Sequence, residues 1–355
     1  MKIVLALDSF KGCLSSGEAN HWAAAGARCA FPEADIVEVA VSDGGEGFTA
    51  AFHAALGGEL VEVPVKDPMM RPVRAHYLLY GQMAVMEVAE ACGLTLLMEE
   101  ERNPLVATSY GVGQMVADAV GRGAEDIIVG LGGSATSDAG TGMLRALIDA
   151  FARHGQWDDI LELKQVKFTI ATDVRNPLCG KNGAAHIFAP QKGATHDMVL
   201  QLDARARKFA DVSAKHFGFD YSGHEGAGAA GGLGYAFMQY LGAESRPGID
   251  LLLEAIGFEE TVHDANLIIT GEGSADRQTL MGKLPTGILR HSRGVPVGLI
   301  AGKTSDRDEL LHAGFTFVEC INPPEMAPRE AMQKEVAQQN ISHTVEDIIK
   351  KHMSK

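Results

Sequence analysis

The stretch "DIVEVAVSDGGEGFTAAFHAAL", residues 35–56, joins the two kinds of element that alternate along the chain. Residues 35–41 form an apolar, β-branched run typical of a strand, and residues 48–56 have the pattern of a helix. Glycines and acidic residues fill the space between them, at 42–47. A strand that gives way to a helix in this manner is typical of an open α/β sheet, whose ligands bind at the carboxyl ends of the strands.

The same alternation recurs through most of the chain. Strands are expected at 2–7, 35–41, 59–65, 74–80, 83–89, 126–131, 167–173, 266–270, 297–302 and 315–320. Helices are expected at 15–30, 48–56, 108–121, 140–152, 196–217 and 232–241, with two more beginning at Pro285 and near 305. This order predicts two α/β domains with largely parallel sheets. Because no linker separates them, we expect a discontinuous Rossmann-like domain of residues 1–75 and 265–355, with residues 76–264 inserted as a domain with a mixed sheet.

Composition limits the class of partner. The chain has 355 residues and a formal net charge of −15, a field that repels nucleic acid. Its five cysteines are scattered and form no CxxC motif, which favours a reduced cytoplasm. No window is apolar for long enough to predict a membrane span. We therefore expect a cytoplasmic protein that acts on a small molecule, and the sequence leaves a homodimer open.

Several strands end in glycine-rich or acidic segments, and these ends supply the candidate site. Glycines in "DGGEG" and "LGGSATSDAGTG" let backbone N–H groups approach an anion, and a following helix N-terminus adds its dipole. Carboxylates at the same ends can hold a divalent cation, orient a hydroxyl or accept its proton. They are Asp8, Asp43, Glu46, Asp138, Asp173, Glu272 and Asp276. Together with Lys11, Lys192 and Lys283 these groups are typical of phosphoryl transfer.

Other glycine motifs compete with this interpretation. "AGKTS" at 301–305 is not a P-loop, because Val297 stands where that motif needs glycine. "GAGAAG" at 226–231 follows no strand. "GLGGSA" at 130–135 follows a strand and is expected to open a helix, so an NAD(P)-dependent oxidoreductase stays open as an alternative. A nucleotide-binding regulator without catalysis is the other alternative.

Six long motifs carry a resemblance to a known family. They are "ALDSFKGCLSS", "SDGGEG", "GLGGSATSDAGTGM", "ATDVRNPLCGKNGAAHIFAPQKGA", "GAGAAGGLGYA" and "TGEGSADRQTLMGKLP". In this order they resemble the bacterial class I glycerate kinases, collinearly from Lys2 to about Thr304. The resemblance implies a two-domain α/β enzyme that uses ATP and Mg²⁺ to phosphorylate D-glycerate, commonly to 2-phosphoglycerate, in a cleft between the domains.

Strand ends and resemblance together define the candidate residues. We expect the catalytic groups to be Asp8, Lys11, Asp43, Asp173 and Asp276. We expect the nucleotide to contact Gly44, Gly45, Gly132, Gly133, Ser134, Lys192, Gly271, Glu272 and Lys283. Asp173 and Asn176 are the candidate Mg²⁺ ligands. The sequence leaves open which hydroxyl is phosphorylated, which domain binds the adenine and which carboxylate is the base.

Two departures from the family pattern bear on the substrate. The segment 153–165 is shorter than the glycine-rich segment typical of the family, which puts any substrate contact from it in doubt. Ser274 stands where the family often has arginine, which removes one candidate partner for a substrate carboxylate. A kinase of another short hydroxy or sugar acid is therefore a further alternative.

Overall fold

The chain divides into two compact units. A computed structural model describes residues 1–10, 12–42, 45 and 47–353. The discontinuous unit comprises Met1–Asp43 and Ile249–Lys355, and the inserted unit comprises Gly44–Gly248. The predicted α/β class with one domain inserted into the other is confirmed, but the boundaries differ from those expected at 75/76 and 264/265. The reason at the first boundary is that β3 (Glu59–Lys66) pairs antiparallel with β4 (Pro72–Tyr80) along its whole length, which keeps both strands in the inserted unit.

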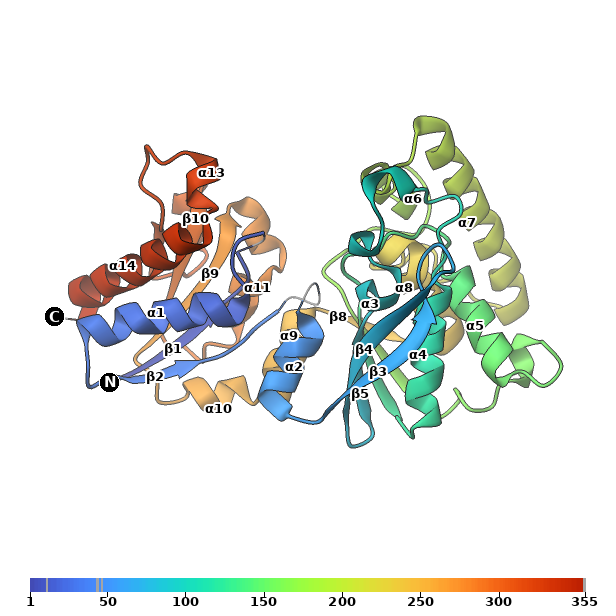
Figure 1. The fold of residues 1–355 in the computed structure, drawn as a ribbon, viewed down its shortest axis with the longest axis horizontal. Coiled ribbons are helices and arrows are strands. Elements are labelled where there is room, and N and C mark those ends of the chain that lie inside the picture. Colours follow the sequence, from blue (N-terminus) through green and yellow to red (C-terminus); the bar gives the residue numbers. More distant parts are fainter. Residues whose placement is uncertain (11, 43–44, 46, 354–355) are drawn as a thin grey trace. The chain divides into compact units, whose positions relative to one another are not determined.

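The discontinuous unit contains a five-stranded parallel sheet in the order β11-β10-β9-β1-β2 (Figure 1). Its strands are β1 (Lys2–Leu7), β2 (Asp35–Glu38), β9 (Leu267–Ala275), β10 (Val297–Thr304) and β11 (Phe317–Cys320). The chain moves outward from β1 to β2 on one side, and after the insertion it moves outward from β9 on the other. The strand order therefore reverses between β1 and β9, and such a switch point is where doubly wound sheets bind ligands.

Helices complete the layers of this unit. Figure 1 shows α1 (Ser16–Ala30) beside α14 (Lys334–Met353), and both pack on Ile3, Leu5 and other apolar residues of the central strands. Ser15 caps α1 with a capping box. The remaining helices are α9 (Gly248–Ala255), α10 (Phe258–Val262), α11 (Leu284–Arg290), α12 (Arg307–His312) and α13 (Pro328–Ala331), with a 3₁₀ helix at Arg277–Met281.

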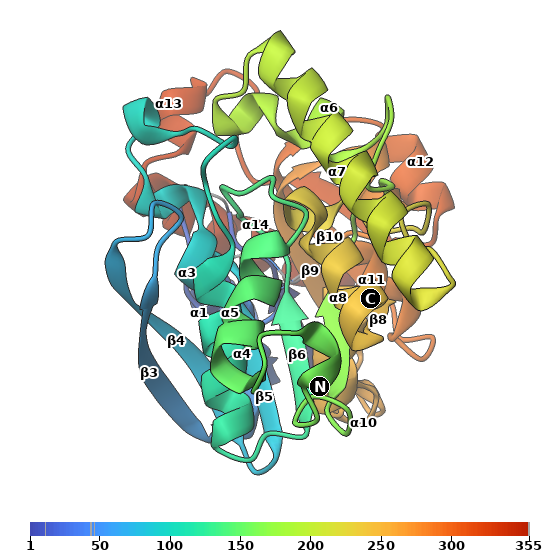
Figure 2. The same ribbon diagram turned by 90° about the vertical axis from the view of Figure 1, so that its right-hand side faces the viewer.

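The inserted unit contains a mixed six-stranded sheet in the order β3-β4-β5-β6-β7-β8. The first three strands form an antiparallel meander, and β5 (Met83–Glu87), β6 (Asp126–Gly130), β7 (Lys167–Ala171) and β8 (Glu244–Arg246) are parallel. Its helices are α2 (Phe48–Leu56), α3 (Ala89–Cys92), α4 (Tyr110–Gly121), α5 (Thr141–Phe151), α6 (Ala184–Phe188), α7 (His196–Phe217) and α8 (Leu233–Leu241). Figure 2 shows α4 and α5 side by side. They approach so closely that a Cβ at Gly113 would lie 2.3 Å from the Met143 carbonyl oxygen.

The short segment 153–165 packs on the core of the inserted unit. Ile160 and Leu163 are buried, and the Trp157 ring meets Tyr240 edge-on at 5.1 Å. This segment therefore closes the core beside α8.

Several strands end elsewhere than predicted. β2 stops at Glu38 and β7 at Ala171, so the polar residues that follow lie in connecting segments. By contrast, β9 and β10 continue through "GEGSA" and "GKT" and pair as far as Thr304 and Ala275. Within the part of the chain that the structure describes, no helix has the length and apolar character to span a membrane.

Candidate functional site

In each unit the candidate residues gather where parallel strands end, and the two edges are described separately. In the discontinuous unit Asp8 follows β1 directly. Its backbone N–H donates to the Gly271 carbonyl oxygen of β9 at 2.9 Å, and its carboxylate accepts the N–H of Ser9 at 2.7 Å. Asp8 and Gly271 therefore lie side by side at the switch point of the sheet, where the sequence predicted a ligand.

Glu272 is the buried carboxylate of this edge, with 6% of its surface exposed. It accepts a hydrogen bond from Thr279 Oγ1 at 2.5 Å and another from Lys283 Nζ at 3.3 Å. Burial raises the pKa of the Glu272 carboxyl, and the bonds from Thr279 and Lys283 act in the opposite direction. Two predicted residues, Glu272 and Lys283, are thus brought together as a carboxylate and an ammonium group.

Asp276 has a structural task at the same edge. Its carboxylate caps the 3₁₀ helix that follows β9 by accepting the N–H of Gln278 at 2.7 Å, and its own N–H donates to Thr279 Oγ1 at 3.1 Å. This turn positions the Thr279 hydroxyl so that it donates to Glu272. One oxygen of Asp276 is therefore engaged with the backbone of this turn.

In the inserted unit the glycines after β6 are held against the segment that follows β5. The Gly133 carbonyl accepts the N–H of Leu94 at 2.9 Å, and the N–H of Ala135 donates to the Cys92 carbonyl at 2.7 Å. Ser134 is buried, whereas Gly133 is exposed. The backbone of Gly132 and Gly133 thus stays at the sheet edge in a fixed conformation.

Lys192 lies beneath this loop. Only 3% of its surface is exposed, and its Nζ donates to Ser134 Oγ at 2.9 Å and to the Thr136 carbonyl at 2.6 Å. Burial lowers the pKa of Lys192 to about 8. The sequence predicted a loop lysine that binds an oxyanion. In the structure the Lys192 ammonium group is instead buried, and its hydrogen bonds stabilise the loop 134–136.

Replacing Lys192 is expected to lower the free energy of unfolding by an amount that depends on pH. Lys192→Met leaves two buried oxygens without their donor, so the free energy of unfolding should fall by about 1–3 kcal/mol at pH 7. Because its pKa is about 8 against 10.5 for a free lysine, the folded wild type loses this proton before the unfolded chain does. Wild-type stability relative to the variant should therefore rise between these two pH values. Urea unfolding of both proteins at pH 7 and pH 10 measures the difference between their free energies of unfolding. The same difference at both pH values would contradict the prediction.

The helix N-termini expected to bind phosphate are capped by the protein itself. α5 begins only at Thr141, so "GLGGSA" does not open it, and the dinucleotide-binding interpretation loses the context it needs. Asp138 accepts the N–H groups of Gly140 at 3.0 Å and Gly142 at 3.1 Å. Its Oδ2 also accepts both the N–H and the hydroxyl of Ser109 at 2.9 Å. The Asp138 carboxylate thus accepts the N–H groups at the start of α5 that were expected to bind a phosphate.

A similar arrangement closes the start of α2. Gly47, the residue before this helix, has a φ of 85°, which favours glycine, and the N–H of Thr49 donates to Glu87 at 2.8 Å. Burial raises the pKa of the Glu87 carboxyl. Glu87 is not among the candidates from the sequence, although an acidic residue at the end of the strand 83–87 was a signal for it. Of the glycines expected here Gly45 is described, and its carbonyl accepts the N–H of Phe48 at 3.3 Å.

Three candidates, Lys11, Asp43 and Gly44, lie outside the described residues, as does Glu46.

Asp173 and Asn176 lie in the segment after β7, and both are half-buried. The Asn176 side-chain amide donates to the Asn182 carbonyl at 2.8 Å, which turns its amide nitrogen toward the protein. Among described residues no group of three or more His, Cys, Asp or Glu side chains could hold a metal ion. One carboxylate and one amide oxygen nevertheless fit Mg²⁺, which keeps several waters and takes substrate phosphates as further ligands.

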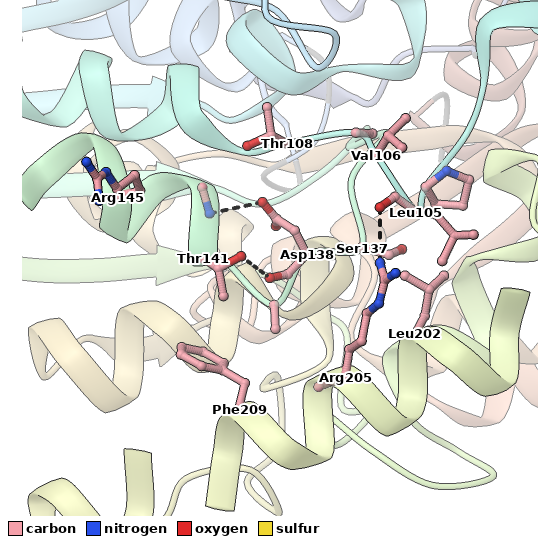
Figure 3. A pocket seen from close by; sticks show the side chains of 15 residues that line it. Leu105, Val106, Thr108, Ser137, Asp138, Thr141, Arg145, Leu202, Arg205 and Phe209 are labelled. Carbon is pink, nitrogen blue, oxygen red and sulfur yellow. Dashed lines mark hydrogen bonds between the residues drawn. The ribbon is translucent and has the colours of Figure 1, made fainter. Parts of the chain in front are cut away.

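The sequence did not predict a pocket of about 420 Å³ in the inserted unit (Figure 3). It lies between residues 104–108, the start of α5 and the face of α7 that carries Leu202 and Phe209. Arg205, which donates to the Leu105 carbonyl at 3.2 Å, lines it together with Ser137, whose buried hydroxyl has no hydrogen-bond partner in the described structure. A guanidinium group beside apolar side chains suits a ligand with both anionic and apolar parts.

Nearly the whole chain is similar to glycerate kinases. The model of the glycerate kinase family matches residues 3–156 and 154–353. "Glycerate kinase" of Bacillus subtilis (strain 168) is 40% identical over 371 residues, covering 98% of this chain and 97% of the relative. "Glycerate 2-kinase" of Escherichia coli (strain K12) is 40% identical over 334 residues, covering 88% of each.

A solved structure is also similar. The crystal structure of the candidate glycerate kinase 2 of Salmonella typhimurium LT2 superposes with a TM-score of 0.83 at 34% identity, covering 100% of this chain and 98% of that one.

Proposed function

Because this chain belongs to the glycerate kinase family, we propose that it transfers the γ-phosphoryl group of ATP to a hydroxyl of D-glycerate and forms 2-phosphoglycerate. Family membership makes the chain a phosphotransferase. The name of the E. coli relative, "Glycerate 2-kinase", supports the choice of hydroxyl. The structural observation that carries the proposal is the switch point, where Asp8 adjoins Gly271 of β9. The next residue of β9, Glu272, pairs there with Lys283, which lies just before α11.

Each unit contributes groups suited to this reaction. In the inserted unit Asp173 is the proposed base that accepts the proton of the attacking hydroxyl, and the backbone of Gly132 and Gly133 faces the phosphates. Lys192 acts through Ser134, whose hydroxyl it positions. In the discontinuous unit Asp8 orients a substrate hydroxyl, while Lys283 offers a positive charge beside Glu272. The roles of Lys11, Asp43, Gly44 and Gly45 rest on the sequence alone.

Asp173 and Asn176 are the residues that would hold Mg²⁺. When bound, the ion would neutralise negative charge that develops on the phosphates during transfer. Little covalent chemistry is then required of the chain, so positioning of the two substrates dominates catalysis.

Coupled ADP release with a panel of short hydroxy acids tests this proposal. D-glycerate should stimulate ADP release well above L-glycerate, which has the opposite configuration, lactate, which lacks the 3-hydroxyl, and tartronate, which carries a second carboxylate in place of the hydroxymethyl group. Removal of the divalent cation with EDTA should abolish the stimulation, and added Mg²⁺ should restore it. A stronger response to another acid would leave the kinase chemistry standing and correct the substrate. An oxidoreductase would instead change NAD(P)H absorbance.

A further inference from the structure

The two central strands of the discontinuous unit project beyond their neighbour. The last pair between β1 and β9 is Leu7 with Gly271, whereas β9 and β10 continue to pair through Ala275 and Thr304. We call the segments 272–275 and 301–304 the strand extension. It is therefore a piece of sheet at the edge where this fold binds ligands.

Contacts on both sides hold the strand extension in place. The N–H of Ser305 donates to the Ala275 carbonyl at 2.9 Å, and the Asn322 side-chain amide donates to the Gly302 carbonyl at 2.7 Å. These hydrogen bonds fix the backbone from which each side chain of the strand extension projects.

Register places one lysine on the face that carries Glu272. Ala301 pairs with Glu272, and Lys303 pairs with Ser274. Side chains alternate along each strand and neighbouring strands lie about 4.8 Å apart, so Lys303, Ser274 and Glu272 share one face of the extension. Glu272 is buried there, whereas Ser274 and Lys303 are exposed.

The cations of this edge differ in how they are neutralised. Arg277 forms an ion pair with Glu309, and Lys283 forms one with Glu272. Lys303 forms no ion pair with any residue that the structure describes. In a chain of net charge −15, an ammonium group left unneutralised at a ligand-binding edge is a local attractor for anions.

We propose that Lys303, assisted by the Ser274 hydroxyl, binds an oxyanion of a substrate, either the carboxylate of the acceptor or a phosphate of the nucleotide. This rests on the proposed function, whose two substrates both carry such groups. An ammonium group binds either anion as a point charge through charge-assisted hydrogen bonds. Because the oxyanion is present in the bound substrate as well as in the transition state, the loss should appear mainly in KM.

The test is Lys303→Ala, with KM and kcat measured for D-glycerate and for ATP. We expect one of the two KM values to rise by about tenfold or more, the loss of one charge-assisted hydrogen bond, with kcat within about threefold. A rise for glycerate identifies the carboxylate as the ligand, and a rise for ATP identifies a phosphate. Lys303→Arg keeps the charge and should recover most of the affinity. Lys351→Ala removes an exposed lysine on α14 and is the matched control.

Unchanged KM values for both substrates, in a variant whose thermal unfolding matches the wild type, would overturn the proposal. If the wild type does not turn over glycerate, the proposed function fails, and calorimetric titration with D-glycerate and with Mg-ATP then decides the role of Lys303. Weaker binding of one of them to Lys303→Ala would support it. Equal binding to both proteins, or none to the wild type, would overturn it.

Discussion

Asp173→Asn is expected to lower kcat by roughly 10²–10⁴-fold in a protein that remains folded. Asparagine keeps the size of the side chain and can still accept a hydrogen bond, but it cannot take a proton from the attacking hydroxyl. It also lacks the charge that a divalent cation prefers. Asp173 is half-buried in the segment between β7 and Asn176. Steady-state kinetics, nucleotide binding and thermal unfolding, measured on the same preparation, check the prediction.

A purely structural Asp173 would behave differently. Asp220 in the same unit provides the matched control, since its carboxylate accepts the N–H of Ser222 at 2.8 Å in an exposed turn. Asp220→Asn should leave both kcat and thermal unfolding close to the wild type, because asparagine serves equally well in such a turn. If Asp173→Asn resembles this control, with turnover within about threefold of the parent and well short of the expected loss, the base assignment moves to Asp276.

Asp138→Ala is expected to lower the free energy of unfolding by about 3–5 kcal/mol. The side chain accepts four hydrogen bonds, from the N–H groups of Gly140 and Gly142 and from the N–H and hydroxyl of Ser109. Ser109 is fully buried, so alanine would leave its donors without a partner and out of reach of water. The starts of α4 and α5 would lose their common anchor.

Urea unfolding measures this loss directly. Arg145→Ala is the control, because it removes an exposed ion pair with Asp149 in the same helix but keeps the hydrogen bond from Tyr110 to Asp149, and such pairs contribute at most about 1 kcal/mol. A loss for Asp138→Ala no larger than that of the control would show that Asp138 does not anchor the two helices.

Local patterns predicted most of the elements. Residues 48–56 and 196–217 are helices with the bounds expected, and the meander at 59–87 follows from β-branched runs joined by tight turns. These features depend on periodicity within one segment, which a sequence displays. The two-unit α/β architecture followed from the order of such elements.

Features that depend on distant partners were beyond the sequence. "GEGSA" has none of the β-branched character of a strand, and it is one only because β10 pairs with it in register. Lys192 looks like a loop lysine until Ser134, 58 positions away, accepts its hydrogen bond. The capping of α2 by Glu87 and the hydrogen bonds between Ser109 and Asp138 likewise join segments that no local pattern connects.

A labelled phosphoryl group shows directly whether the chain phosphorylates D-glycerate with ATP. The protein is incubated with D-glycerate, Mg²⁺ and ATP labelled at the γ-phosphate, and the products are separated and then treated with enolase. We expect the label to move to glycerate and enolase to consume the labelled product without a phosphoglycerate mutase, as 2-phosphoglycerate requires. Label found only in ATP or inorganic phosphate, with ADP formation unchanged by glycerate, would contradict it.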